Sequence, residues 1–171
     1  MRRTLLLAIA TALLAAVGTA QPRGLKVFVS VDMEGISGVV DGEQVRDEAR
    51  EYATARRWMA EDVNAVVAGL LQAGAGEIVV NDSHGSMRNL SPDDLRPEAT
   101  LISGSPKPLA MMAGLDGSFD AVVFVGYHAA SGTGAAVLEH TWSGRVAELR
   151  LNGRAVGETM AARAHRRRAP A

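Results

Sequence analysis

The chain has 171 residues, of which 47% are hydrophobic and 22% charged, as expected for one folded globular domain and not for a disordered or repetitive chain. It contains no cysteine, which excludes disulfides, thiolate metal sites and a cysteine nucleophile, so any metal has to be bound by His, Asp and Glu. All 19 acidic side chains lie between residues 21 and 162, where they outnumber the basic ones, and this charge balance argues against a nucleic-acid surface.

The first 20 residues have the pattern of an export signal. Arg2 and Arg3 precede an apolar stretch at 5–17, and three small residues follow at 18–20. The apolar stretch is too short to cross a bilayer comfortably. We therefore expect residues 1–20 to be a signal peptide that is removed, and the mature protein to be exported, either periplasmic or secreted, without stable insertion in the membrane.

The next part of the chain predicts a strand, a helix and a second strand. Residues 25–31 are apolar and β-branched, which favours a buried strand. The segment 48–73 carries apolar residues at the spacing of one helical face, and these are Met59, Val63, Val66, Val67, Leu70 and Leu71. Residues 77–80 form the next short apolar run. The order strand, helix, strand predicts that the two strands are parallel.

The later part of the chain predicts two further strands, at 100–103 and 120–125, with a helical turn at 109–113 between them. Polar and apolar residues then alternate, and Asn152-Gly153 is a strong signal for the turn of a β-hairpin. A helix is expected to begin directly after this hairpin, near Glu158.

These elements predict an α/β fold. We expect a layered α/β/α arrangement with a mainly parallel sheet and an additional antiparallel hairpin. No repeat and no linker interrupts residues 21–162, so this range is predicted to be one domain. Residues 163–171 are rich in Arg and Ala and form an atypical basic tail.

Acidic and histidine side chains follow three of the predicted strands. Asp32 and Glu34 follow the first strand. His84 follows the second, and His128 follows the last of the parallel strands. Because the carboxyl ends of parallel strands share one edge of a sheet, these four side chains are expected to converge. Two carboxylates with two imidazoles suit zinc or a similar divalent metal better than calcium or magnesium.

Each of these positions alone has an ordinary structural explanation. A single His after a strand is more often a surface or loop residue, and an Asp there often caps a helix. Asp82, Ser83 and His84 are the residue types of a serine-hydrolase triad, but neighbours in sequence seldom meet as nucleophile and base. The glycine-rich segment 131–134 lacks the Lys of a phosphate-binding loop, so a turn is favoured there.

Several sequence blocks, in the same order along the chain, resemble the DppA-type zinc D-aminopeptidases. The blocks are SVDMEGISG at 30–38, VNDSH at 80–84, LISG at 101–104, GYHA at 126–129, EH at 139–140 and NGRAVGE at 152–158. Together they extend over most of the predicted domain, and their occurrence in register is not a chance pattern.

The resemblance implies a binuclear zinc aminopeptidase that hydrolyses short peptides with an N-terminal D-amino acid. It implies five metal ligands, which are Asp32, Glu34, His84, His128 and Glu158. Asp32 matches the carboxylate that bridges the two zinc ions. His140 matches the catalytic histidine of the family, which is not a metal ligand. The resemblance also implies a small peptide as substrate and a large ring-like homo-oligomer.

The end of the chain departs from the family, whose members continue well beyond the block at 152–158. Residues 159–171 do not resemble the family continuation, and we expect a frameshift, a gene fragment or a miscalled end. A first alternative is therefore an inactive exported fragment that binds metal or peptide. A second is a two-metal phosphoesterase, although no Arg or Lys cluster lies near the ligand blocks to bind phosphate.

Overall fold

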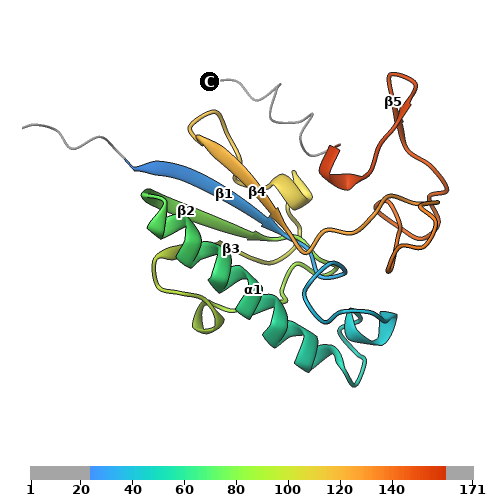
Figure 1. Cartoon of the computed structure of the whole chain (residues 1–171), viewed down its shortest axis with the longest axis horizontal. Helices are drawn as coiled ribbons and strands as arrows, with labels where there is room; N and C mark the ends of the chain where they lie inside the picture. The colour runs from blue at the N-terminus through green and yellow to red at the C-terminus, as the bar shows by residue number, and fades with distance from the viewer. Residues whose placement is uncertain (1–23, 161–171) are drawn as a thin grey trace, which may run out of the picture.

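The computed structural model describes residues 24–160, so the predicted signal peptide and the basic tail lie outside the described residues. The central sheet has four strands in the order β3-β2-β1-β4. In chain order these strands are β1 (Leu25–Val31), β2 (Ala75–Asp82), β3 (Ala99–Ile102) and β4 (Ala121–Val125). All three neighbouring pairs are parallel, which confirms the predicted α/β fold with its parallel sheet (Figure 1).

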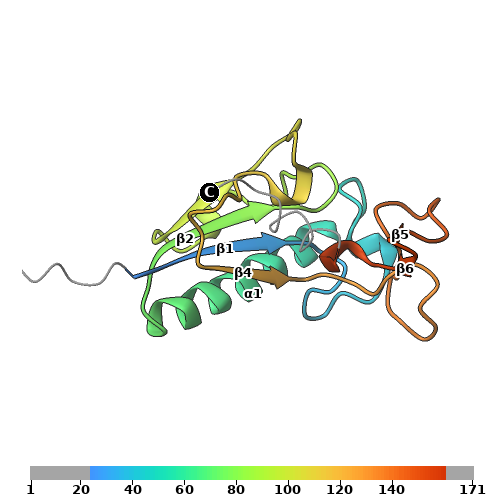
Figure 2. The ribbon, with the colours of Figure 1, turned by 90° about the horizontal axis from the view of Figure 1, so that it is seen from above.

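Strand β1 lies in the interior of the sheet, between β2 and β4. Val29 pairs with Val80 on β2 and with Val123 on β4. A strand that is covered on both faces is predominantly apolar, which explains why five of the seven residues of β1 are apolar. Figure 2 shows β1, β2 and β4 pointing toward the same end of the molecule, where the loops that follow the strands gather.

Helix α1 (Tyr52–Gln72) covers one face of the sheet. Its apolar stripe packs there, and Met59, Val63 and Val67 are fully buried. The helix ends where Gly74 takes a positive φ of 86° and its N–H donates to the carbonyl oxygen of Leu71, at 3.0 Å. A left-handed residue of this kind after the last turn is a common helix stop, and glycine adopts it without steric cost.

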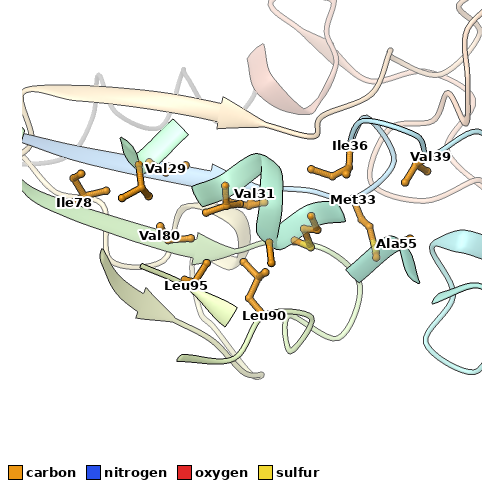
Figure 3. Packing of buried hydrophobic residues seen from close by; sticks show 14 of the residues in the cluster. Val29, Val31, Met33, Ile36, Val39, Ala55, Ile78, Val80, Leu90 and Leu95 are labelled. Atoms are coloured by element: carbon orange, nitrogen blue, oxygen red, sulfur yellow. The ribbon is translucent and has the colours of Figure 1, made fainter. Parts of the chain in front are cut away.

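The larger apolar core lies between α1 and the sheet. Figure 3 shows Val29 and Val31 of β1 with Val80 of β2, and Leu90 and Leu95 from the connection after β2 close this core at one side. Because side chains alternate along a strand, the even-numbered residues of β1 face the opposite side.

That opposite face is covered by a short 3-10 helix, η3 (Ala110–Met112), and by the chain around it. Phe28 and Phe119 pack there edge to face, with ring centroids 5.4 Å apart, and Met112 and Leu115 complete this second cluster. The predicted helical turn at 109–113 is therefore confirmed, and it supplies the second layer.

The remaining elements are short. Two further 3-10 helices, η1 (Gly42–Gln44) and η2 (Pro92–Asp94), flank the region of α1. The predicted hairpin is formed by β5 (Arg150–Leu151) and β6 (Arg154–Ala155), which pair antiparallel across a turn at Asn152 and Gly153, both of positive φ. Helical backbone begins at Glu158, as predicted. No helix within residues 24–160 has the length and apolar character that a membrane crossing requires.

Candidate metal centre

The four polar side chains that follow the strands meet at the carboxyl edge of the sheet. The imidazole Nδ1 of His84 lies 3.2 Å from Oδ1 of Asp32 and 3.0 Å from Oε2 of Glu34. On the other side, Nε2 of His128 lies 3.4 Å from Oδ2 of Asp32. The convergence expected from the parallel strand order is therefore present, and Asp32 is at its centre, with one oxygen toward each imidazole.

Glu158 and His140, which come from outside the sheet, join the same cluster. Oε1 of Glu158 lies 3.6 Å from Nε2 of His128 and 3.9 Å from Nε2 of His140. Nε2 of His140 also lies 4.0 Å from Oε1 of Glu34. The rings of His128 and His140 stack with their centroids 3.7 Å apart and their planes 14° from parallel. All six predicted site residues are thus in one cluster.

The ligand atoms are spaced closely enough to hold metal ions. Two groups of three residues each offer one ligand atom per residue, and within each group these three atoms lie within 4.8 Å of one another. One group consists of Asp32, Glu34 and His128, and the other of His128, His140 and Glu158. The geometry therefore places His140 close enough to be either a metal ligand or a free imidazole beside the ions.

Backbone carbonyls fix which nitrogen each imidazole presents to the carboxylates. Nε2 of His84 lies 2.7 Å from the carbonyl oxygen of Val45, and Nδ1 of His128 lies 3.0 Å from that of Ala129. In the neutral form of each ring the nitrogen beside the carbonyl donates its hydrogen, which leaves the lone pair of the other nitrogen facing the cluster. Metal-binding histidines are usually oriented in this way.

The buried Nε2 of His128 supplies a test of whether these residues fit a metal. Among the buried side-chain nitrogen and oxygen atoms of residues 24–160, this atom alone makes no hydrogen bond. Burying a polar atom without a partner is costly, and nearly all such atoms in folded proteins are satisfied. In the neutral form of His128 this nitrogen directs a lone pair toward two carboxylates, an arrangement that a bound zinc ion would satisfy, so the residues fit the metal.

Burial and close contacts shift the ionisation of the cluster strongly. Burial by itself lowers the pKa of both His84 and His128, but their contacts with Asp32, together with those of Glu34 and Glu158, raise each pKa to about 10. Burial raises the pKa of Asp32. For Glu34 burial is outweighed by the hydrogen bond and charge of His84, and the pKa falls to about 2. Without a metal, protons on the imidazoles thus balance the carboxylates.

Structural supports that the sequence did not reveal hold these side chains in place. Glu158 accepts a hydrogen bond from the backbone N–H of Trp142, a residue in the left-handed region with φ of 66°. Asp82 accepts hydrogen bonds from the backbone N–H groups of Asn89 and Leu90, and the Asn89 amide donates to the carbonyl of His84. Asp82 and Asn89 therefore fix the loop that carries His84.

Ser83 is not arranged as a catalytic nucleophile. Its hydroxyl lies 2.8 Å from that of Ser30 and accepts a hydrogen bond from the amide of Asn81 at 3.0 Å. Asp82 is engaged with Asn89 and Leu90, as described above. The residue types of a serine-hydrolase triad are therefore adjacent in sequence without forming the hydrogen-bond chain of a triad.

A cavity of about 320 Å³ opens onto the cluster. Five of the six site residues line it, together with Ser83, Gly85, Met87, Met111 and Trp142. No Lys or Arg of the described chain is among the lining residues. A second cavity of about 600 Å³ shares Glu34 and His84 with the first and extends along the segment 43–49. The space around the cluster is thus large enough for a small molecule.

Comparison with known proteins gives consistent matches. The family model of the M55 peptidases, described as D-aminopeptidase, matches residues 25–168. A curated D-aminopeptidase of Bacillus subtilis (strain 168) is 43% identical over 134 residues, which cover 78% of this chain. The solved structure of the Zn-dependent D-aminopeptidase DppA from Bacillus subtilis, described as a self-compartmentalizing protease, superimposes with a TM-score of 0.79 at 42% identity over 81% of this chain.

These matches cover only part of each relative. The aligned region corresponds to 48% of the curated protein and to 50% of the chain in the solved structure. The chain therefore spans about half the length of the relatives that it matches.

Proposed function

Because the chain belongs to the M55 peptidase family of D-aminopeptidases, we propose that it is a binuclear zinc aminopeptidase that hydrolyses short peptides with an N-terminal D-amino acid. The observation that carries the proposal is the meeting of three carboxylates and three imidazoles at one edge of the sheet, with Nε2 of His128 buried and without a hydrogen bond. The zinc dependence of the solved relative supports the choice of metal.

The metal ligands proposed are the five residues expected from the resemblance. Asp32 would bridge two ions, since its two oxygens face different imidazoles. Glu34 and His84 would complete the ligand set of one ion, and His128 and Glu158 that of the other. When bound, the two zinc ions would polarise the scissile carbonyl and lower the pKa of a water molecule, so that hydroxide is available near neutral pH.

His140 is proposed as the group that holds or moves a proton at Nε2. Its Nδ1 lies 2.9 Å from the carbonyl oxygen of Leu138, which fixes the ring and directs Nε2 toward Glu34 and Glu158. His140 also lines the 320 Å³ cavity, where a substrate would bind. An imidazole in this position can take a proton from the attacking water or give one to the leaving amine.

The charge of the cavity favours a peptide over a phosphate ester. Phosphate recognition usually depends on Arg or Lys, and the cavity is lined by neither within the described chain. A peptide bond is neutral, and its free amino terminus is cationic near the carboxylates of the cluster. We therefore retain the peptidase and do not propose a phosphoesterase.

Assembly, domain extent and export are part of the same proposal. The description of the solved relative as self-compartmentalizing supports a homo-oligomer. The family match over residues 25–168 supports a single metallopeptidase domain, which we place at residues 21–162, and the leader pattern supports removal of residues 1–20 during export.

The test combines metal analysis with hydrolysis. The chain is purified without metal, reconstituted with zinc, and analysed for zinc per chain and for cleavage of D-alanyl and L-alanyl dipeptides. The proposal requires about two zinc ions and faster cleavage of the D-alanyl peptide. A folded chain that binds zinc and cleaves neither peptide would support an inactive metal-binding protein, and a folded chain that binds no zinc would refute the site.

A further inference from the structure

Three buried hydroxyl groups form a connected cluster directly beneath the metal centre. Oγ of Ser30, on β1, lies 2.8 Å from Oγ of Ser83 and 2.7 Å from the phenolic oxygen of Tyr127. The same Ser30 oxygen lies 2.7 Å from the carbonyl oxygen of Met111 in η3. Ser30 is fully buried and Ser83 is almost fully buried. Ser30 is thus the common partner of three segments that are far apart in sequence.

One arrangement gives every hydroxyl hydrogen an acceptor, although the Ser83 hydroxyl also lies 3.1 Å from the carbonyl oxygen of Asn81 and 3.3 Å from that of Met111. In this arrangement Ser30 donates its single hydroxyl hydrogen to the carbonyl oxygen of Met111, which can only accept. The oxygen of Ser30 then accepts from the hydroxyls of Ser83 and Tyr127. Ser83 in turn accepts from the amide of Asn81. In this arrangement Ser30 uses its full hydrogen-bonding capacity. Ala would remove the hydroxyl, whereas Thr would keep it and add one methyl group.

Each member of the cluster lies one or two residues before a predicted metal ligand. Ser83 immediately precedes His84, and Tyr127 immediately precedes His128. Ser30 lies two residues before Asp32, whose two oxygens face those two imidazoles. The hydroxyl cluster therefore connects the ends of β1, β2 and β4 on the face opposite α1. The metal ligands follow one or two residues later in each segment.

We propose that Ser30 is a positioning residue of the metal centre, whose hydroxyl sets the separation of His84 and His128 on either side of Asp32. The inference rests on the proposed zinc site. The sheet hydrogen bonds align the strands along their length, and the hydroxyl cluster fixes how the three ends are spaced across the sheet. A change of a few tenths of an ångström there is significant, because metal–ligand distances tolerate only about 0.2 Å.

The experiment measures zinc affinity and ligand geometry in the full chain. Zinc dissociation constants are obtained by competition with a chromophoric chelator, and the visible spectrum of the cobalt-substituted protein reports the ligand field. The variants are Ser30→Ala and Tyr127→Phe, which each remove hydroxyl hydrogen bonds, and Ser30→Thr, which keeps the hydroxyl. Val67→Ala is the control, because it shortens a fully buried side chain of α1 away from the cluster.

Ser30→Ala is expected to weaken zinc binding by about 10-fold to 100-fold, the usual range for a residue that orients a ligand. Tyr127→Phe should weaken it in the same direction, both variants should change the cobalt spectrum, and Ser30→Thr should recover most of the affinity. Val67→Ala should lower the melting temperature and leave zinc affinity and spectrum unchanged.

Two results would overturn the inference while leaving the zinc site intact. The first is an unchanged affinity and spectrum in both Ser30→Ala and Tyr127→Phe. The second is an equal loss of affinity in Val67→Ala, which would show that zinc affinity follows general stability. If the unaltered chain itself binds no zinc, the proposed function fails and this inference fails with it.

Discussion

Gly35 lies where two loops of the metal centre approach most closely, so Gly35→Ala is a direct test of how the ligands are positioned. A Cβ atom on Gly35 would lie 2.2 Å from the carbonyl oxygen of Tyr127. The loop after β1 carries Asp32 and Glu34, and the loop after β4 carries His128. The substitution therefore pushes apart the two loops whose side chains share the proposed metals.

The size of the effect follows from the contacts at this point. A carbon atom needs about 3.3 Å from a carbonyl oxygen, so the loops have to separate by about 1 Å. Two backbone hydrogen bonds join them, Asp32 N–H to Val125 O at 2.8 Å and Gly35 N–H to Gly126 O at 2.7 Å. Losing both costs about 1–3 kcal/mol, and the overpacking costs about 1–3 kcal/mol more. We expect about 2–6 kcal/mol less free energy of unfolding and at least tenfold weaker zinc binding.

Urea unfolding of the metal-free chain and zinc competition titrations measure the two quantities. Gly69→Ala makes the same chemical change in α1, where a Cβ meets nothing within 4 Å. This control should gain stability by about 1 kcal/mol, because alanine is the better helix former. If Gly35→Ala unfolds and binds zinc like the unaltered chain, the close approach of the two loops does not position the ligands.

Four further predictions concern the site itself. The pKa values of His84 and His128, raised to about 10 in the metal-free chain, predict that zinc affinity increases from pH 6.5 toward pH 10 as the metal replaces these protons, and a flat titration profile would exclude them as ligands. The same raised pKa values give the metal-free chain stability that is complete below pH 6.5 and is lost as the pH rises through about 10, which unfolding curves across this range measure. In elemental analysis Asp32→Ala should remove more zinc than Glu34→Ala, because of these two carboxylates only Asp32 has one oxygen toward the imidazole of His84 and the other toward that of His128. His140→Ala should keep its zinc and lose turnover by about 100-fold or more, whereas loss of zinc would identify His140 as a ligand.

Strands were predictable where burial on both faces makes the sequence mostly apolar. Residues 25–31 coincide with β1, and the strand predicted at 77–80 lies within β2, whose buried part is 78–82. The helix was placed at 48–73 but begins at Tyr52, since the residues before it form turns and Glu51 makes no side-chain cap that would mark the start. The short helices η1 and η2 were not predicted, because three residues contain no periodicity.

The candidate site was predictable only where the topology brings residues together. Asp32 and His84 follow neighbouring parallel strands, so the strand order alone places them side by side. Glu158 and His140 follow no strand of the sheet, and only the resemblance to the family indicated them. The carbonyl of Val45, which orients His84, left no signal because every residue has a backbone carbonyl. Met111 is both buried and part of the cavity wall, and an apolar residue in the sequence indicates only the first of these.

The contact of both Asp32 and Glu158 with His128 has a consequence for the order of events during synthesis. Asp32 directly follows β1 and Glu158 lies in the last described turn of helix, so an ion held by both would close nearly the whole described chain into one loop. Such a cross-link restricts the unfolded ensemble in the manner of a disulfide. The complete ligand set does not exist until residue 158 has left the ribosome. Stable retention of zinc would therefore mark chains that have been synthesised and folded through to that residue.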